Sequence, residues 1–495
     1  MVFPILGSGD SSAGYNIENS LRFNDEDSPA LYRANDSGGS NTIATISFWT
    51  KKGPNQGGMK AFYARSDNNN NAVIAISGSP ENRLELRSYN GGNLDMQMKC
   101  AANVRDHSAW YHIVMMWVTA DGTASDRARM YINGERVTDF HTYSDLFGSS
   151  DTMEWFQSDA TFYISGEWEN GTIGNAWDGY IAEVYVIDGT AYDASTFGET
   201  DEDSGIWKPK NAFPTYGTNG FRLEFKQTGT SANSSGMGAD TSGNDNHLTV
   251  SNLTALDQTT DTPTNNFCTM NPLDNYWADA TLAEGNLQVT MPTTSGYYSF
   301  LRATMGVAKG KWYWEVKGVS TTDSNSDYGV VGFAHSPATT RADHLGRAYT
   351  SPGNGYGHYG HGGGFWYNGS QVTIDSGGDT SWRLNLLHFA LDLDNNKIWW
   401  GIDGTWLDSG DPTSGATGTG ADTVVDASLT AGGFYSPAIG DLDSGGTYVF
   451  SANFGNPAFT ISSGNADDNG YGNFEFDVPT GFYALCSKNL AEFGG

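Results

Sequence analysis

Trp110-Tyr111-His112-Ile113-Val114 and Lys311-Trp312-Tyr313-Trp314-Glu315-Val316 are two distant stretches that share one pattern. In both, aromatic or aliphatic residues alternate with polar ones, which is typical of strands with one buried face. Similar segments follow each stretch and are punctuated by Gly and Asn-Gly turns: 131–134, 178–184, 331–334 and 453–455. Repeated strands of this kind form two sheets packed face to face. The sequence therefore predicts an all-β chain of two antiparallel, jelly-roll-like β-sandwich domains.

The composition supports this fold class. The chain has 495 residues, enough for two or three domains. It contains 63 Gly and 13% aromatic residues but only 17% charged residues, a balance that suits short strands joined by tight turns. No long stretch shows the 3.6-residue apolar period of a helical protein.

The formal net charge is −31, from 57 acidic and 26 basic residues. Nucleic acid and anionic membrane surfaces are therefore excluded as expected partners, because their phosphates would be repelled. Two interpretations of the acidity stay open. It keeps the protein soluble in a saline medium, where self-repulsion is screened, or some of the aspartates bind calcium.

The three cysteines, Cys100, Cys268 and Cys486, are too far apart in sequence to indicate a disulfide framework or a metal cluster. The first residues, Met1 to Gly7, show no basic segment followed by a long apolar one. The run from Trp110 to Val118 is too short to span a bilayer. We expect a protein made in a cytoplasm, without membrane insertion, and release by cell lysis is one way in which it could leave the cell.

Three regions are expected along the chain. Residues 1–226 form the first sandwich, 227–294 a polar connector, and 295–495 the second sandwich. Asn133-Gly134 lies between two strand candidates and predicts a two-residue hairpin turn. The segment Asp394 to Lys397 predicts another hairpin. The connector is rich in Ser, Thr, Asn, Asp and Gly and has few apolar clusters.

The first region resembles the laminin G-like, concanavalin A-like family. The matching stretches are Ala109 to Val114, Arg129 to Gly134 and Trp177 to Val184. The resemblance implies a jelly-roll sandwich that binds glycans or proteins through loops on its rim, often with calcium.

The second region resembles the SPRY family. Six landmarks occur in the order of that family: 310–316, 330–334, 391–400, 435–439, 449–455 and 481–486. The resemblance implies a bent sandwich of two sheets that binds partners through loops and does not catalyse reactions.

The whole arrangement is similar to large structural proteins of tailed phages from marine bacteria. The stretches that carry this likeness are 14–24, 188–203, 217–221 and 261–267. The resemblance implies a virion surface protein, either a tail fibre or a head decoration.

A catalytic pair of carboxylates is the first candidate site. Glycoside hydrolases built on a sandwich place two carboxylates at one sugar bond, and acids at alternate positions of a strand share a face. Two candidate pairs, Asp392 with Asp394 and Asp441 with Asp443, run directly into turns. The group Glu199, Asp201 and Asp203 lies on no apolar strand. Glu183 and Asp188 lie five residues apart, so they point to opposite faces of a regular strand. No nucleophile elbow, zinc-protease helix or phosphate loop is present. We therefore expect no enzyme activity.

A calcium loop is the second candidate. Oxygen-bearing side chains occur at alternate positions, at Asp240, Ser242, Asn244 and Asn246, as at the start of a calcium-binding loop. The glutamate expected at the twelfth position is absent, because Ser251 stands there. The alternative is a set of Asx turns.

A ligand-binding loop is the third candidate. The segment Gly353 to Tyr367 interleaves many glycines with aromatic and histidine side chains, and aromatic rings stack on sugars. So many glycines argue against a regular strand. The predicted ligand residues are Tyr356, His358, Tyr359, His361 and Trp366. The alternative is a folded loop whose aromatic side chains cover the edge of the sandwich.

These observations together predict a non-enzymatic phage virion protein that contacts host-surface glycans or other virion proteins through its loops. Two alternatives remain: a purely structural capsid decoration or cement protein, and a polysaccharide depolymerase. Fibre and decoration proteins are often homo-oligomers, but no heptad repeat specifies an oligomeric state.

Overall fold

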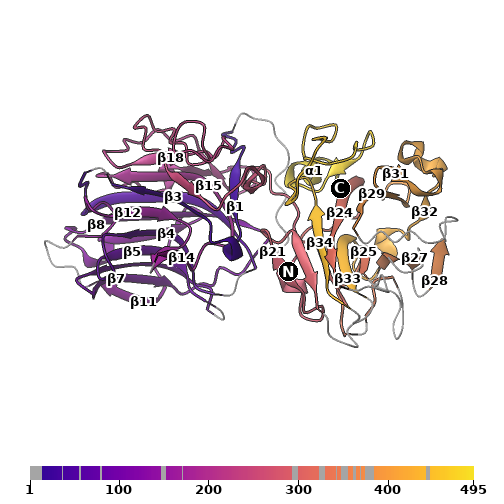
Figure 1. Cartoon of the computed structure of the whole chain (residues 1–495), viewed down its shortest axis with the longest axis horizontal. Coiled ribbons are helices and arrows are strands. Elements are labelled where there is room, and N and C mark those ends of the chain that lie inside the picture. Colours follow the sequence, from indigo (N-terminus) through magenta and orange to yellow (C-terminus); the bar gives the residue numbers. More distant parts are fainter. Residues whose placement is uncertain are drawn as a thin grey trace. The chain divides into compact units, whose positions relative to one another are not determined.

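The computed structural model divides the chain into two compact units between Thr264 and Asn265. We call residues 10–264 the first unit and residues 265–495 the second unit (Figure 1). The structure describes residues 14–35, 37–54, 57–78, 81–145, 152–169, 171–292, 299–322, 329–341, 343–346, 355–359, 364–367, 370–373, 384–441 and 446–494.

The first unit is built from two large antiparallel sheets. Sheet A has the strand order β10 (Glu135–Arg136), β9 (Ala128–Ile132), β8 (Trp110–Val118), β3 (Ile43–Lys52), β15 (Gly179–Asp188), β1 (Ser20–Phe23) and β20 (Gln258–Thr259), and β18 (Phe221–Leu223) also pairs with β15. Sheet B has the order β11 (Phe140–Asp145), β7 (Asn93–Cys100), β6 (Leu84–Asn90), β5 (Asn71–Ile76), β4 (Met59–Arg65), β12 (Thr161–Ile164), β2 (Ala30–Ala34) and β19 (Thr249–Ser251).

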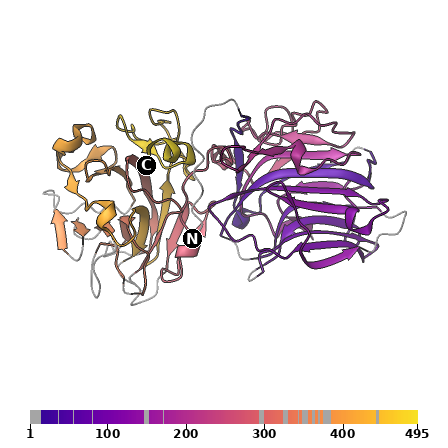
Figure 2. The same cartoon turned by 180° about the vertical axis from the view of Figure 1, so that it is seen from behind.

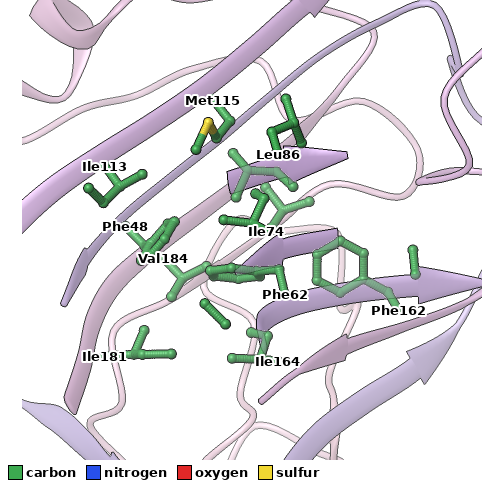
Figure 3. Packing of buried hydrophobic residues seen from close by; sticks show 14 of the residues in the cluster. Phe48, Phe62, Ile74, Leu86, Ile113, Met115, Phe162, Ile164, Ile181 and Val184 are labelled. Carbon is green, nitrogen blue, oxygen red and sulfur yellow. The ribbon is translucent and has the colours of Figure 1, made fainter. Parts of the chain in front are cut away.

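The core of the first unit lies between these sheets. Phe48 of sheet A and Phe62 of sheet B meet with ring centroids 4.6 Å apart. Around them, apolar side chains from both sheets interdigitate (Figure 3). Trp117 and Trp155 stack at 6.0 Å within the same core. The alternating pattern of the strands thus places one face of each sheet in a shared core, as expected for a sandwich.

Short elements complete the first unit. Two small hairpins are β13 (Glu167–Glu169) with β14 (Thr172–Gly174), and β16 (Gly198–Thr200) with β17 (Trp207–Pro209). The predicted turn at Asn133-Gly134 joins β9 to β10, and both residues have positive φ angles, 48° and 83°. Two successive positive φ angles define the type I′ turn that matches strand twist.

The second unit is also built from two large sheets (Figure 2). Sheet C has the order β21 (Thr281–Ala283), β22 (Gln288–Met291), β34 (Tyr448–Asn453), β24 (Lys311–Thr321), β29 (Leu386–Asp392), β30 (Lys397–Ile402) and β31 (Thr405–Trp406), with β32 (Asp422–Thr423) on β30 and β35 (Tyr483–Ala484) on β24. Sheet D has the order β23 (Phe300–Arg302), β33 (Ser436–Asp441), β25 (Gly329–Ala334), β26 (Gly355–Tyr359), β27 (Gly364–Tyr367) and β28 (Ser370–Thr373).

Aromatic side chains dominate the core of the second unit. Trp314 of sheet C stacks on Phe389 at 5.0 Å and meets Phe333 of sheet D edge-on at 6.3 Å. The predicted hairpin from Asp394 to Lys397 joins β29 to β30, with Asp392 paired to Lys397. The two units therefore confirm the expected all-β class with antiparallel sheets packed around separate cores.

Helical structure is sparse in the part of the chain that the structure describes. One α-helix, α1 (Ser487–Phe493), lies near the end of the chain. Short 3-10 turns occupy Asp25–Asp27, Ala124–Asp126, Ala194–Thr196, Ala255–Asp257, Pro272–Asp274, Leu407–Ser409, Pro412–Thr417 and Ala427–Leu429. None of these described helices is long and apolar enough to cross a membrane.

The segment expected as a connector, 227–294, differs from the division in the structure. Its first part supplies β19 and β20, which pair with β2 and β1 of the first unit. Its last part supplies β21 and β22 to sheet C. These strands are only two to four residues long, so the polar composition of the segment gives no sign of them. The boundary between the two units lies after Thr264 and not at 226 and 294.

Candidate functional site

The outer face of sheet A is covered. Side chains that point away from the core on β8 and β15 pack under the segment 192–216, which contributes Phe197, Ala212 and partly buried aromatic residues. Tyr15 and Ile17 cover the neighbouring patch around Trp49 and Tyr180. This face is therefore closed to a dissolved ligand.

His112 holds the covering segment 192–216 in place through its contacts with Trp207. Its ring stacks on Trp49 at 4.8 Å and on Trp207 at 5.9 Å. Trp207 Nε1 donates a hydrogen bond to His112 Nδ1 at 2.9 Å, and Nε2 lies 2.9 Å from Ser47 Oγ. Because an indole N–H only donates, Nδ1 carries the lone pair and the proton of the neutral ring lies on Nε2.

Burial lowers the pKa of His112 to about 3. The unfolded chain binds a proton at this residue below about pH 6.5, whereas the folded ring stays neutral until about pH 3. We therefore expect the free energy of unfolding of the first unit to fall on acidification through that window, by at most ~1.4 kcal/mol per pH unit from this group. Denaturant titrations at pH 7.5, 6 and 5 measure the slope.

The variant His112→Gln should reduce this slope. It should not abolish the slope, because burial also lowers the pKa of His107 to about 4. His141 is exposed, so His141→Gln is the matched control and should keep the wild-type slope. An unchanged slope in His112→Gln would contradict the assignment.

Both outer faces of the second unit are covered as well. On sheet C, Tyr313 and Trp399 pack against Phe474 and Phe482 of the C-terminal segment. On sheet D, Phe300 and Val330 pack with Leu345, and Trp277 and Trp366 lie against this cluster. Among the described residues, sheet B is thus the sheet whose outer face remains partly open.

Cross-strand pairing aligns a row of side chains on the outer face of sheet B. In order across the sheet, the row is Tyr32, Tyr163, Tyr63, Val73, Arg87 and Gln97. The neighbours of these residues along each strand, such as Phe62 and Leu86, belong to the core. Five strand spacings of about 4.8 Å make the row about 24 Å long.

The hairpin β13–β14 covers the middle of this row. Its Ile173 packs on Tyr63 and Tyr163, which are only 4% and 7% exposed. Its Glu167 forms an ion pair with Lys60. Trp168 lies opposite Ile173 in the hairpin, so both side chains point to the same face. Trp168 is nevertheless 40% exposed, which makes it an accessible aromatic ring beside the sheet.

The strands β6 and β7 form the open part of the face. Glu85, Arg87 and Tyr89 occur at alternate positions of β6 and share its outer side, as do Gln97 and Lys99 on β7. The guanidinium of Arg87 lies 6.0 Å from the ring centroid of Tyr89. Arg87, Tyr89, Gln97 and Lys99 are all partly exposed. We call these four residues, with Trp168, the sheet B site.

The predicted calcium loop forms a hydrogen-bonded clip. Asp240 Oδ1 accepts from the backbone N–H groups of Arg222 and Ser242, and its Oδ2 accepts from Ser242 Oγ and Asn246 N–H. The amide groups of Asn244 and Asn246 donate to the backbone carbonyl of Gly220 and of residues near it. This geometry fits the alternative of Asx turns.

Among the described residues, no group of three or more His, Cys, Asp or Glu side chains could hold a metal ion.

The structure corrects the prediction of a ligand-binding loop. Residues 355–359 and 364–367 form β26 and β27, paired within sheet D. Tyr356, His358 and Tyr359 are 1%, 3% and 2% exposed, so they are not accessible to a dissolved ligand. Trp366 is partly buried against the same sheet, and His361 lies outside the described residues.

The glycines of this hairpin explain the error. A Cβ atom on Gly355 would lie 2.2 Å from the carbonyl oxygen of Phe333, and one on Gly357 would lie 2.8 Å from Val330 Cγ2. These glycines therefore permit close packing of strands and do not mark a flexible loop.

The candidate carboxylates serve structural roles. Asp392 caps its turn by accepting from the N–H groups of Asp394 and Asn395, and Asp188 holds Ser40 and Asn219. Glu183 sits at a bulge in β15 with a φ angle of 48° and pairs with Arg222. Asp201 caps a turn through Ser204. Asp443 lies outside the described residues.

Comparison with known proteins fits this architecture. Residues 25–194 match the family model of the concanavalin A-like lectin/glucanases superfamily. The first unit contains a concanavalin A-like domain. The match covers most of the strands of sheets A and B, including the whole sheet B site of this concanavalin A-like domain. No curated protein matches the chain.

Three solved structures are similar to parts of the chain. The SPRY domain of human HERC1 is 17% identical over 35% of this chain and 91% of its own, with a TM-score of 0.27. A heptameric SAP-like pentraxin from Limulus polyphemus is 18% identical over 36% and 79%, with a TM-score of 0.27. A putative carbohydrate binding protein from Bacteroides ovatus is 12% identical over 48% and 58%, with a TM-score of 0.33. At TM-scores this low, the likenesses carry no argument about function.

Sequence reasoning did not single out the residues of the sheet B site. The alternation of Glu85, Arg87 and Tyr89 on one strand is the pattern that could have indicated them, because residues at i, i+2 and i+4 share a face. Whether that face is covered depends on distant segments, which the pattern does not report.

Proposed function

We propose that this chain is a non-enzymatic recognition protein that binds host-surface glycans through the sheet B site. The observation that carries the proposal is the accessibility of this face, since the other three outer sheet faces are covered by described segments. A concanavalin A-like domain suits the binding of sugars or proteins.

The chemistry of the site favours a sugar. Trp168 and Tyr89 offer aromatic rings, on which the C–H faces of sugars stack. Arg87, Gln97 and Lys99 supply hydrogen-bond donors at defined positions of regular strands. A protein partner would instead be expected to require a larger apolar centre, whereas the exposed positions of β6 and β7 are mostly polar.

We further propose that the chain acts on the surface of a phage particle, on a tail fibre or as a head decoration, beside other virion proteins. The support is the resemblance of its stretches to structural proteins of marine tailed phages. An antibody against the chain should label intact particles; labelling only of disrupted particles would contradict this location.

Binding without cleavage separates this proposal from a depolymerase. The candidate carboxylates cap turns or pair with buried cations, so we expect no reducing ends to be released from host polysaccharide. Release that is lost on changing one carboxylate would overturn the proposal.

The binding proposal predicts the effect of two substitutions. Trp168→Ala and Tyr89→Ala should each weaken glycan binding by about tenfold, because one stacked ring is removed. Glycan-array binding and calorimetric titration with the intact chain measure the change. Phe213 is 83% exposed in the same unit, so Phe213→Ala is a matched control that should bind like wild type.

Two outcomes would overturn this assignment of the face. Unchanged binding in Trp168→Ala and Tyr89→Ala would place the glycan elsewhere. A dimer that Trp168→Ala disrupts, seen by light scattering, with no glycan bound by the wild type, would assign the face to a second copy of the chain.

A further inference from the structure

We propose that the sheet B site selects acidic glycans, and that Arg87 contacts their carboxylate or sulfate groups. This inference rests on the proposed glycan binding and names the class of sugar. It follows from three observations: the charge balance of the strands, the incomplete pairing of Arg87, and the position of Arg87 beside the partly exposed ring of Tyr89.

The strands of sheet B differ in charge balance from the whole chain. Acidic residues of flanking segments pair with two of their cations, Glu167 with Lys60 and Glu81 with Lys99. The four strands β4 to β7 carry four basic residues and two acidic ones: Lys60, Arg65, Arg87 and Lys99 against Glu85 and Asp95. The whole chain has 26 basic and 57 acidic residues. In a saline medium, charges more than about 8 Å apart are screened. An acidic ligand therefore senses Arg87 and its near neighbours more than the distant net charge.

Arg87 is a cation of this face whose hydrogen-bond donors are only partly paired. Its ion pair with Glu85 spans 3.6 Å, which is too long for a good hydrogen bond. Glu85 Oε1 already accepts from Gln97 Nε2 at 2.8 Å, and Lys99 lies 3.8 Å from Oε2. Arg87 Nε is buried and has no hydrogen-bond partner among the described residues.

A carboxylate or sulfate would accept hydrogen bonds from the accessible part of the Arg87 guanidinium, since this side chain is 30% exposed. A guanidinium presents a planar fork of N–H donors that fits two oxygens of one acidic group, and such charge-assisted pairs are stronger than neutral hydrogen bonds.

The neighbouring Tyr89 fixes the orientation. Its ring lies 6.0 Å from the guanidinium on the same strand face. A sugar ring on this face can therefore place its acidic substituent toward Arg87 while its C–H face lies on an aromatic ring. This combination distinguishes an acidic sugar from a free anion, which gains nothing from the aromatic ring.

The test compares matched sugars on the intact chain. Polygalacturonate and chondroitin sulfate are titrated beside methyl-esterified polygalacturonate and desulfated chondroitin, so that the carboxylate and sulfate sources are separate arms. We expect the acidic member of at least one pair to bind about tenfold to a hundredfold more tightly than its matched derivative, and this preference to weaken with added salt.

Substitution of Arg87 locates the selectivity. Arg87→Gln should bring the acidic sugar down to the affinity of its matched derivative, and Arg87→Lys should recover only part of the preference, because an ammonium lacks the fork. Arg105 is exposed in the same unit, so Arg105→Gln removes the same charge elsewhere and should keep the preference. Near-native thermal unfolding of each variant shows that it is folded.

The outcomes separate the two proposals. Equal binding of acidic and matched sugars overturns the inference and leaves glycan binding intact. An acidic preference that survives in Arg87→Gln overturns the role of Arg87. If the wild-type chain binds no member of this panel or of a wider glycan array, the proposed function fails and the inference fails with it.

Discussion

Asp261→Ala is expected to lower the free energy of unfolding of the first unit by about 3–5 kcal/mol. Asp261 Oδ2 lies 2.5 Å from Lys51 Nζ, and both side chains are fully buried. Tyr180 and Trp110 lie around the ammonium, with ring centroids 5.0 and 5.9 Å away. Removal of the carboxylate leaves a buried cation without its counter-ion, which costs far more than the loss of an exposed ion pair.

The effect should be confined to one unit. Differential scanning calorimetry should show the first unit unfolding about 10 °C lower, with the transition of the second unit unchanged. Replacing both partners, in Lys51→Met with Asp261→Leu, should recover most of the loss, because no buried charge remains. Asp203 is exposed, so Asp203→Asn is the control. A loss below about 1 kcal/mol in Asp261→Ala would contradict this account.

Glu315→Ala is expected to destabilise the second unit by a similar amount, about 3–5 kcal/mol. The carboxylate of Glu315 is fully buried on the outer side of sheet C. It accepts hydrogen bonds from Tyr313 Oη, Asn453 Nδ2 and the backbone N–H groups of Glu475 and Phe476. Alanine would leave all four donors without an acceptor in a buried place.

This loss should appear first in the segment that covers sheet C. Glu315 ties residues 475 and 476 to β24, and Phe474 packs on Tyr313 at 5.0 Å. Hydrogen exchange should therefore show reduced protection of the amides of Glu475 and Phe476 in Glu315→Ala. Ser320 lies exposed on the same strand, and Ser320→Ala should change stability by no more than about 0.5 kcal/mol. Unchanged protection of these amides in Glu315→Ala would show that Glu315 does not hold residues 475 and 476 on β24.

Glu315→Gln provides a graded comparison. Its amide keeps one acceptor oxygen but directs an NH₂ group at donors. We expect it to lie between wild type and Glu315→Ala, because some of the four hydrogen bonds survive. Burial raises the pKa of the Glu315 carboxyl, while its four hydrogen bonds oppose that shift. The comparison therefore tests whether acceptor capacity or packing dominates.

Local features of the sequence predicted the strands and turns well. The stretch from Trp110 to Val118 is β8, and Lys311 to Val316 lies within β24, as their alternation indicated. The turn at Asn133-Gly134 has the expected geometry, because glycine and asparagine tolerate positive φ angles. In each case the physical cause lies within a few residues of the feature.

Predictions about exposure were less successful. Tyr356 appeared in a glycine-rich stretch that resembled a loop, yet it stacks on Tyr367 at 4.3 Å and on Phe333 at 5.0 Å inside sheet D. Strands too short to show a periodic pattern, such as β19 and β20, were likewise hidden in a polar segment. Their pairing with β2 and β1 depends on residues more than 200 positions away.

The sequence by itself determined the fold class, because strand alternation and turn chemistry act between neighbouring residues and need no knowledge of the rest of the chain. Only the tertiary structure decided which sheet faces are covered. The pair of Lys51 and Asp261 joins residues 210 positions apart, and the cover over His112 comes from Trp207. Alternation shows that Arg87 and Tyr89 share a face of β6. That this face remains open follows from where distant segments pack, since burial is a property of the whole assembled unit.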